Sequence, residues 1–403
     1  MGTVIDALIV GAGPAGSATA WELARRGHRV VALDRARFPR DKPCSEYLGP
    51  ETVRLLARCG VVADLERAGA EPLWGTTVIG PRGSRLTGRF AAATVRPYRD
   101  AGLSVARRIL DDRLVQLARD AGAQVEEGLA VEELLYEGGA VSGVVARDRT
   151  GARRAIHARL TIGADGLRSV VARRIGRRRH GAPSRMAFVA HVAGVPGLTG
   201  LAEMHVSDAG YVGVNRIAPG LANVALVIPA ALVRAARGDQ TGFFLEELER
   251  FPGVRGRVQR QAIVREVLVT GPFAAWSGRV VADGALLVGD AADFFDPFTG
   301  EGIYAALRGA ELVGETVSDA LAGGGPLTAR RLAGYRVARR GSFAGKWLVE
   351  RLVGFGMWSP RLFDRAVARL EARGLGPTFI GVTADYVPAR TVLNPWFLSR
   401  MVL

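Results

Sequence analysis

The chain has 403 residues, of which 48% are hydrophobic and 23% are charged, and this composition predicts a globular protein rather than a disordered one. Two cysteines are too few for a disulfide framework and suit a reducing compartment, so we expect a cytoplasmic protein. No run of about 18 apolar residues is present to span a membrane. The formal net charge is +15, and nearly all the basic residues are arginine. Because the arginines are scattered and no nucleic-acid motif accompanies them, we interpret them as a solvated surface and expect no nucleic-acid partner. An anionic lipid surface or an acidic carrier of the substrate is the alternative.

The first predicted element is a βαβ unit. Residues 4–10 (VIDALIV) form a β-branched apolar run that predicts a strand. A helix is expected from Pro14 to Gly27, and residues 28–34 (HRVVALD) predict a second strand. The following loop, residues 35–50, is polar and rich in proline.

The remaining elements alternate in character along the chain. Helices are expected at 51–60 and 107–123, and short strands at 74–100. Residues 183–275 consist of short apolar runs between turn residues, which predicts an antiparallel sheet inserted into the first domain. A buried strand returns at 284–290, and a mainly helical pattern follows from about residue 301.

The turn between the first strand and helix reads GAGPAG and places Gly11, Gly13 and Gly16 in the spacing that binds a dinucleotide. Gly11 permits a tight turn, Gly13 lets the backbone approach a pyrophosphate, and Gly16 allows close packing of helix on strand. Free N–H groups at the helix start hold the anion. Asp34 ends the second strand, where a carboxylate can accept hydrogen bonds from ribose hydroxyls.

Further motifs follow this turn in a fixed order. Arg107 begins an R-x-x-L-D sequence, and Asp165 lies in ADGLRS at the mouth of another helix. Gly289 and Asp290 end the strand at 284–290, and the sequence DPFTGEGI then leads into an apolar helix. The chain has two cysteines and five histidines without ligand spacing such as CxxC, so we expect no metal site.

This ordered set of motifs resembles the FAD-dependent hydroxylase superfamily, and KPC in the loop after the second strand with DPFTGEGI resembles the geranylgeranyl reductase family most closely. The resemblance implies an α/β fold: a Rossmann-type FAD-binding domain of the glutathione-reductase-2-like kind with an inserted antiparallel substrate sheet and C-terminal helices. The expected FAD-binding domain is discontinuous and comprises residues 1–73, 101–182 and 276–320. The substrate sheet is expected at residues 74–100 and 183–275, and the helical region at 321–403.

The resemblance also implies site residues. Asp290 would bind the ribityl chain, and the helix beginning near Ile303 would direct its positive end at the flavin. Asp165 and Arg107 would lie near the pyrophosphate. The predicted cofactor-binding residues are Gly11, Gly13, Pro14, Ala15, Gly16, Asp34, Arg35, Cys44, Arg107, Asp165, Gly289, Asp290, Pro297, Gly300, Gly302 and Ile303.

Four residues are candidates for catalysis. Cys44 could approach the flavin or a substrate, or be a buried small hydrophobe. Glu46 could deliver a proton if burial raised its pKa, or be a solvated loop residue. His191 and His205 lie on predicted strands of the substrate sheet, where a structural role is the alternative.

The resemblance leaves several reactions open. The preferred interpretation is an NAD(P)H-dependent monooxygenase acting on an apolar or aromatic small molecule of secondary metabolism. The alternatives are a prenyl reductase, a halogenase and a non-catalytic flavin-binding protein. Prenyl reductases carry Y-x-W-x-F-P in the middle sheet, whereas Gly213 replaces the tryptophan here and Asn215-Arg216 replaces the Phe-Pro pair. The W-x-W-x-I-P sequence of halogenases is missing.

The electron donor and the partners are further expectations. No second GxGxxG follows a strand, and the resemblance implies that NAD(P)H docks transiently in the cleft. The C-terminal segments KWLVERLVGFGMW and LNPWFLSRMVL combine aromatic and basic residues. These segments could line a substrate tunnel, touch a membrane surface or form core.

Overall fold

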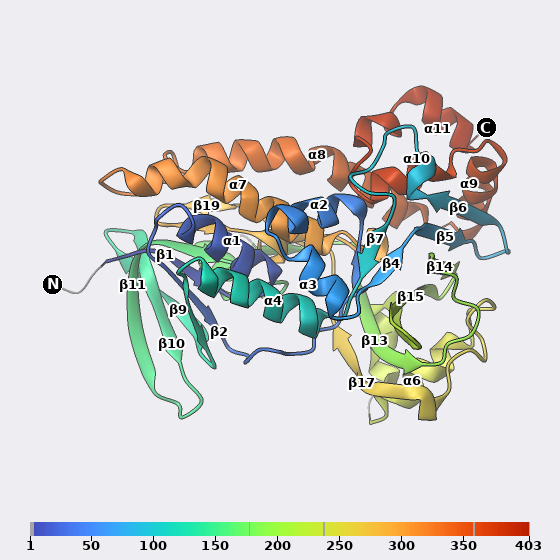
Figure 1. The fold of residues 1–403 in the computed structure, drawn as a ribbon, viewed down its shortest axis with the longest axis horizontal. Coiled ribbons are helices and arrows are strands. Elements are labelled where there is room, and N and C mark those ends of the chain that lie inside the picture. The colour runs from blue at the N-terminus through green and yellow to red at the C-terminus, as the bar shows by residue number, and fades with distance from the viewer. Residues whose placement is uncertain (1–3, 177, 237, 358, 403) are drawn as a thin grey trace.

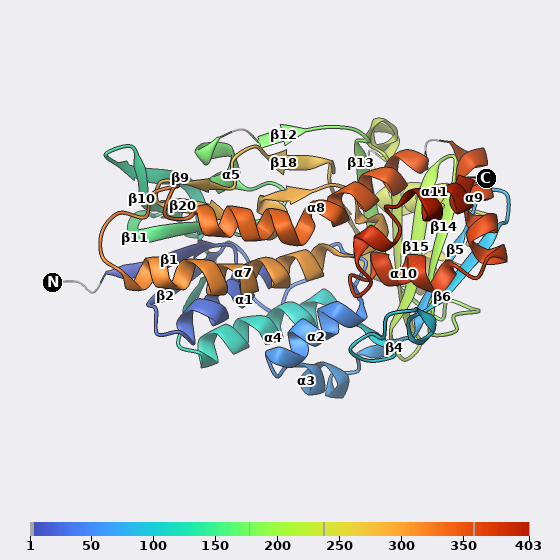
Figure 2. The same ribbon diagram turned by 90° about the horizontal axis from the view of Figure 1, so that it is seen from above.

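The computed structural model describes residues 4–176, 178–236, 238–357 and 359–402. It places an α/β region beside a second sheet whose strands run across those of the first (Figures 1 and 2). In the first sheet, β1 pairs in parallel with β2 and β11, and β11 also pairs in parallel with β20. The first sheet comprises, in spatial order, β19 (Val281–Ala282), β20 (Ala285–Leu287), β11 (Arg153–Gly163), β1 (Ile5–Val10), β2 (Val30–Asp34) and β8 (Gln124–Glu127), with β10 (Ala140–Arg147) on β11 and β9 (Ala130–Glu137) on β10.

Helices cover the first sheet because its central strands are apolar on both faces. The last four residues of β1 are all buried, as a strand between two helical layers requires. Figure 2 shows α1 and α4 on one side of the long helices α7 and α8. The helices of this region are α1 (Pro14–Ala24), α2 (Pro50–Arg58), α3 (Val62–Arg67), α4 (Arg107–Asp120), α5 (Val170–Ile175), α7 (Gly302–Ala322) and α8 (Ala333–Gly356).

The middle sheet is largely antiparallel, with one parallel pair between β14 and β5. Its two faces belong to different cores: one face packs with α9, α10 and α11, and the other with α6. In spatial order its strands are β17 (Ile263–Thr270), β13 (Arg185–Ala193), β16 (Leu221–Pro229), β15 (Gly210–Ala218), β14 (Ala202–Ser207), β5 (Gly75–Ile79) and β6 (Arg85–Arg89). The covering helices are α6 (Gln240–Leu248), α9 (Pro360–Ala372), α10 (Gly376–Thr383) and α11 (Pro395–Val402).

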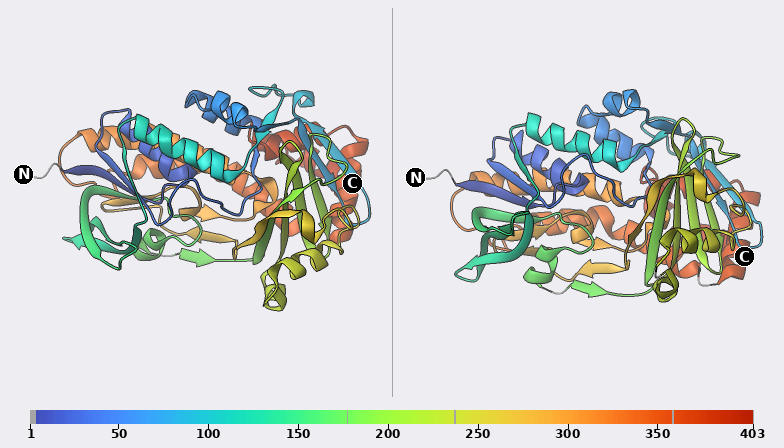
Figure 3. Two further views of the ribbon diagram at one scale, coloured as in Figure 1. Left: turned by 60° about the horizontal axis from the view of Figure 1, so that its bottom comes forward. Right: turned by 90° about the horizontal axis from the view of Figure 1, so that it is seen from below.

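Two small sheets connect these regions, and Figure 3 shows the middle sheet meeting the end of the α/β region. The strands of the first are β3 (Tyr47–Leu48), β7 (Gly102–Ser104) and β4 (Glu71–Leu73). The strands of the second are β12 (Arg178–His180), β18 (Ala275–Ser277) and β21 (Asp293–Phe294). Short 3₁₀ turns complete the chain: η1 (Phe90–Ala92), η2 (Ala230–Ala236), η3 (Arg260–Ala262), η4 (Gly289–Ala291), η5 (Pro297–Thr299) and η6 (Ala389–Thr391).

The predicted fold class is confirmed, with an α/β body, an antiparallel sheet and C-terminal helices. The domain boundaries stay a prediction, although β5 and β6 do pair within the middle sheet. The expectation of strands alone between 183 and 275 is wrong at α6. There the side chain of Asp239 caps the helix by accepting a 2.8 Å hydrogen bond from Gly242 N, and Phe243 and Phe244 bury against the sheet.

Among the residues that the structure describes, no helix is both long and apolar enough to cross a bilayer.

Candidate cofactor and substrate site

A cavity lies where the first sheet meets the middle sheet. Its volume is about 1190 Å³ when the space open to solvent at its mouth is included. The parallel strands β1, β11 and β20 end at the same edge of the first sheet. The segments that follow them contribute Pro14, Ala164 and Asp290 to the cavity wall. The opposite wall is apolar and comes from the middle sheet. Ligand sites in doubly wound folds occur at this carboxyl edge, so the topology itself brings distant motifs together.

The glycine-rich turn lies at the start of α1 and has no room for side chains at two positions. A Cβ on Gly16 would stand 1.7 Å from the carbonyl oxygen of Gly11. Gly11 itself has φ +95°, and a Cβ there would stand 2.6 Å from the oxygen of Ala164. The N-cap of α1 is Gly13, which supplies no side-chain hydrogen bond, so the first N–H groups of the helix stay available for an anion. Pro14 and Ala15 line the cavity beside them.

Asp34 braces this turn from the end of β2. Its carboxylate accepts 2.8 Å hydrogen bonds from Ala12 N and from Ala36 N. A ribose hydroxyl would donate to the remaining lone pairs of the two Asp34 carboxylate oxygens. This ribose contact stays a prediction. Arg35, the next residue, is exposed.

Arg107 reaches the cavity from the first turn of α4 and is held by Asp111, one helical turn later. The two side chains form a bidentate pair, with Nε to Oδ1 at 2.7 Å and Nη2 to Oδ2 at 2.8 Å. Burial opposes the charged guanidinium, but the Asp111 carboxylate raises the pKa of Arg107 above its ordinary value. Asp111 was not assigned from the sequence, although its i,i+4 spacing from Arg107 in R-x-x-L-D is the signal that indicates the pair.

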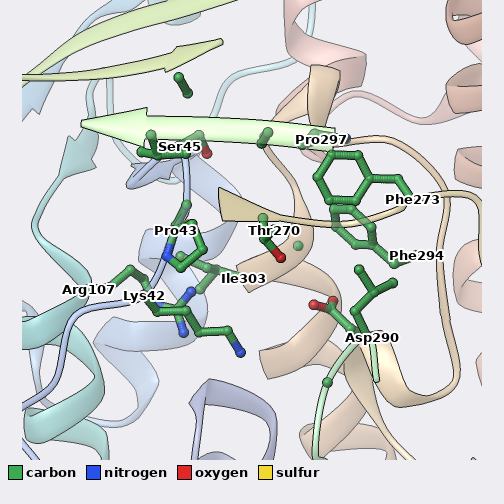
Figure 4. A pocket seen from close by; sticks show the side chains of 18 of the residues that line it. Lys42, Pro43, Ser45, Arg107, Thr270, Phe273, Asp290, Phe294, Pro297 and Ile303 are labelled. Atoms are coloured by element: carbon green, nitrogen blue, oxygen red, sulfur yellow. The ribbon is translucent and has the colours of Figure 1, made fainter. Parts of the chain in front are cut away.

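Asp290 and Lys42 are oppositely charged groups of the same cavity (Figure 4). Burial raises the pKa of Asp290, and the charges of Lys42 and Arg107 act against that rise. Burial, followed by the charges of Arg107 and Arg40, lowers the pKa of Lys42. Lys42 was also not assigned from the sequence, although it begins the KPC motif. Gly289, directly before Asp290, has φ +59° and faces α1 rather than the cavity.

The DPFTGEGI segment forms the remaining wall beside the first turn of α7. Pro297, Gly300, Gly302 and Ile303 all line the cavity. Gly300 has φ +72°, and a Cβ there would stand 2.9 Å from the ring of Tyr47. Because α7 has no side-chain N-cap, its first N–H groups are available at the cavity as well.

Asp296 ties this segment to the middle sheet and was not assigned from the sequence. Its Oδ1 accepts hydrogen bonds from the hydroxyl of Tyr211 at 2.6 Å and from Phe298 N at 3.0 Å. Its Oδ2 accepts from Nη1 of Arg185 at 2.8 Å. Burial, followed by the Asp296 charge, raises the pKa of Tyr211 well above its ordinary value. Tyr211 also lines the cavity, so the network positions one of its walls.

Of the four catalytic candidates, Cys44 lines the cavity, and its sulfur accepts a 3.3 Å hydrogen bond from Glu46 N. Glu46 is fully buried behind the lining with φ +56°. Its Oε1 accepts from Arg107 N at 2.9 Å, and its Oε2 lies 2.7 Å from Nε2 of His191. Because Ala106 supplies no side-chain cap to α4, Glu46 acts as the cap from another segment.

His205 and Asp165 also lie behind the lining. His205 pairs with Glu203 at 2.9 Å on β14. Asp165 accepts from Val170 N at 2.6 Å at the start of α5, and burial raises its pKa. Its Oδ1 is buried and has no hydrogen-bond partner among the described residues. The structure therefore brings Glu46 and His191 together but leaves His205 in a separate hydrogen-bonded pair with Glu203.

These features fit FAD. The α1 N-terminus offers bare N–H groups for a pyrophosphate. At the other end of the cavity, beside the start of α7, Asp290 offers a hydrogen-bond acceptor and Lys42 offers a donor. These groups suit the ribityl chain and the isoalloxazine ring of FAD. A long dinucleotide can use both ends at once. Among the described residues, no group of three or more His, Cys, Asp or Glu side chains is arranged to hold a metal ion.

Known proteins are similar to this chain over most of its length. A family model described as FAD binding domain matches residues 4–343. Menaquinone reductase of Mycolicibacterium smegmatis is 31% identical over 336 residues, which are 79% of this chain and 77% of that protein. Digeranylgeranylglycerophospholipid reductase 1 of Methanococcoides burtonii is 29% identical over 361 residues, 85% of this chain and 81% of that protein.

Solved structures extend the comparison. The myxobacterial chondrochloren halogenase CndH has a TM-score of 0.81 and 25% identity, over 99% of this chain and 95% of that one. PqsL, a probable FAD-dependent monooxygenase from Pseudomonas aeruginosa, has a TM-score of 0.70 and 22% identity, over 89% of this chain and 98% of that one. The likeness to PqsL concerns the fold alone. The resemblance predicted from the motifs is confirmed, and the chain belongs to the FAD-binding family of oxidoreductases that includes FAD-dependent hydroxylases and geranylgeranyl reductases.

Proposed function

We propose that the chain is an NAD(P)H-dependent flavin monooxygenase that oxidises an apolar or aromatic small molecule. The observation that carries this proposal is Gly213 on β15, which lines the cavity at the position where prenyl reductases carry tryptophan. A Cβ on Gly213 would meet nothing closer than the terminal methyl of Met204, at 3.7 Å. The wall is therefore bare where a prenyl reductase places a large ring.

The substrate side of the cavity has an apolar surface. Ala187, Val189, Ala225 and Val227 of the middle sheet line it. Small and β-branched side chains exclude water without supplying hydrogen-bond partners, and this favours a substrate with little polarity.

A second hollow continues this space past Gly213 and Met204, toward Phe379 and Ile380 of α10. Residues Gly213 and Met204 line both the cavity and this hollow. An elongated substrate could place one end beside the flavin site and the other beneath α10. The proposed substrate class is therefore an apolar molecule longer than a single ring.

When bound, FAD supplies the two-electron reduction of oxygen that monooxygenation needs. The residues of the chain hold and tune this group. Asp290 accepts hydrogen bonds from the cofactor, and Lys42 and Arg107 balance its negative charge. The first N–H groups of α7 stabilise charge at the same end of the site. Glu46 and His191 are proposed as positioning residues, because they hold the start of α4 and hence Arg107.

A prenyl-type reductase is the second candidate, and Cys44 is the observation that favours it. Reducing a carbon–carbon double bond needs a hydride for one carbon and a proton for the other. Cys44 places a thiol in the cavity wall as a proton donor. The relatives with reductase names add support at the level of sequence.

Mass spectrometry of the product distinguishes these reactions. The FAD-loaded protein is reduced, mixed with apolar phenols or polyprenyl compounds, and divided between anaerobic and aerated samples. Gain of one oxygen atom only after aeration supports the monooxygenase. Gain of two hydrogen atoms without oxygen refutes it in favour of the reductase, and incorporation of added chloride or bromide would indicate a halogenase.

A further inference from the structure

A basic groove lies outside the cofactor cavity, between α8 and the segment from β18 to β19. The volume of this groove is about 1830 Å³ when the space open to solvent is included. Arg336, Arg340 and Arg351 of α8 line one side, and Arg279 lines the other. Spacings of four and eleven residues place the three helical arginines on one face of α8, because these spacings are close to whole helical turns.

These four guanidinium groups carry uncompensated charge. Within the part of the chain that the structure describes, none of the four makes an ion pair or a side-chain hydrogen bond, and all four are exposed. Asp283 contributes one carboxylate to the groove, and its Oδ1 accepts from Ala329 N at 2.6 Å. The groove therefore keeps a net positive charge, which favours an anion that can accept bidentate hydrogen bonds.

The fifth arginine of the groove, Arg339, is neutralised. Its Nη2 lies 2.7 Å from Oδ2 of Asp293, and its guanidinium stacks 5.2 Å from the ring of Trp347. The indole nitrogen of Trp347 donates to Oδ1 of Asp293 at 3.2 Å. Trp347 is thus held in place by Arg339 and Asp293 while it lines the groove with Trp276 of β18. A pair of indoles beside free arginines matches a ligand that combines flat rings with phosphates.

The groove and the cofactor cavity share a wall. Phe294 of β21 lines both spaces, and its ring lies 5.3 Å from that of Phe273. Figure 4 shows both rings at the edge of the cavity, near Asp290. A ligand in the groove would lie across Phe294 from the flavin site.

We propose that this groove binds a phosphate-bearing molecule with flat rings, and that its occupant is the pyridine dinucleotide that donates electrons. The second part rests on the proposed function, because a flavin monooxygenase needs such a donor and the chain has no second dinucleotide motif. Under this proposal, the adenine half of NAD(P)H docks in the groove and not in the cofactor cleft that the sequence analysis favoured. Arg336, Arg340 and Arg351 bind the phosphates, and Trp276 and Trp347 contact the adenine ring. The nicotinamide end then extends past Phe294 into the cavity, because a hydride passes only between rings in direct contact.

The test measures binding of NADP⁺ to the FAD-loaded protein by calorimetry, so that no reduction takes place. The variant Arg336→Gln/Arg340→Gln is compared with Arg96→Gln, which changes an exposed arginine between η1 and β7 that does not line the groove. Loss of a charged hydrogen bond weakens binding by about tenfold or more, so the double variant should show at least this rise in Kd. Its FAD content should match that of the parent, and Arg96→Gln should bind NADP⁺ normally.

Equal NADP⁺ affinity in the double variant and the parent would overturn the proposal. If inorganic pyrophosphate binds with the same arginine dependence but NADP⁺ does not bind, the phosphate groove stands and the dinucleotide assignment is wrong. Failure of both probes, or arginine-dependent binding only of phosphatidylglycerol vesicles, overturns the small-molecule site. Oxygen insertion after chemical reduction of FAD by dithionite tests the proposed function separately, since no pyridine nucleotide is then needed.

Discussion

Replacement of Asp296 by asparagine removes the charge at the centre of the link between the cofactor loop and the middle sheet. The carboxylate accepts from Tyr211, Arg185 and Phe298 N, and Arg185 and Asp296 are both almost fully buried. The variant leaves the Arg185 guanidinium as a buried charge without a counter-ion.

The expected loss follows from these contacts. A hydrogen bond from a phenol to a charged acceptor contributes about 1.5–3 kcal/mol. A buried charge that loses its partner destabilises a protein by about 3–5 kcal/mol. These values do not add, because the amide oxygen of asparagine still accepts one hydrogen bond. We therefore expect the Asp296→Asn variant to lose about 3–5 kcal/mol of unfolding free energy, dominated by the effect on Arg185.

The assay is urea denaturation with and without FAD, together with FAD titration. Asp148→Asn is the control, since Asp148 accepts hydrogen bonds within the exposed turn before β11 and makes no ion pair among the described residues. Its loss of unfolding free energy should be much smaller than that of Asp296→Asn, because water replaces the contacts of an exposed carboxylate. The affinity for FAD should fall in Asp296→Asn because the loop before α7 is no longer held. A loss as small as that of the control would refute the assignment of Asp296 as the central ion of the network.

Further predictions concern the cofactor, the substrate and pH. Asp290→Asn should raise the Kd for FAD by about tenfold or more, measured by quenching of flavin fluorescence, because a charged hydrogen bond is lost; an unchanged Kd would contradict its role. Gly213→Trp should keep FAD binding but lower substrate turnover, since the indole fills the cavity; equal turnover would place the substrate elsewhere. Burial, only partly opposed by Lys346, raises the pKa values of Glu350 and Asp385 to about 7. The folded state then holds more protons than the unfolded state, so the free energy of unfolding should fall as pH rises from about 4.5 to about 7. Glu350→Gln should reduce that fall in urea midpoints, and an identical pH profile would refute the assignment.

Much of the local structure was predictable because it depends on nearby residues. The apolar run before GAGPAG predicts β1, and the following small residues predict α1, both of which are present. The helix at 107–123 is confirmed as Arg107–Asp120. Helix α6 was missed because its phenylalanines resemble the apolar runs of the neighbouring strands, and burial against the sheet decides its conformation.

Part of the site was predictable in the same way. Pro14, Arg107, Asp290 and Gly302 were predicted from motifs, and all line the cavity. Lys42 was not assigned, because its contribution depends on distances to residues that lie far along the chain.

The sequence by itself indicated the cofactor class through a family resemblance, because the motifs that carry it are short runs of small or charged residues that can be read without the fold. Only the tertiary structure decided where the catalytic candidates lie. It buries Glu46 against His191 behind the lining and leaves Cys44 at the surface of the cavity. It also joins Tyr211 and Arg185 to Asp296. Motif spacing reports contacts within a turn or a helix, whereas these contacts form when separate sheets meet and bury polar groups that then need partners.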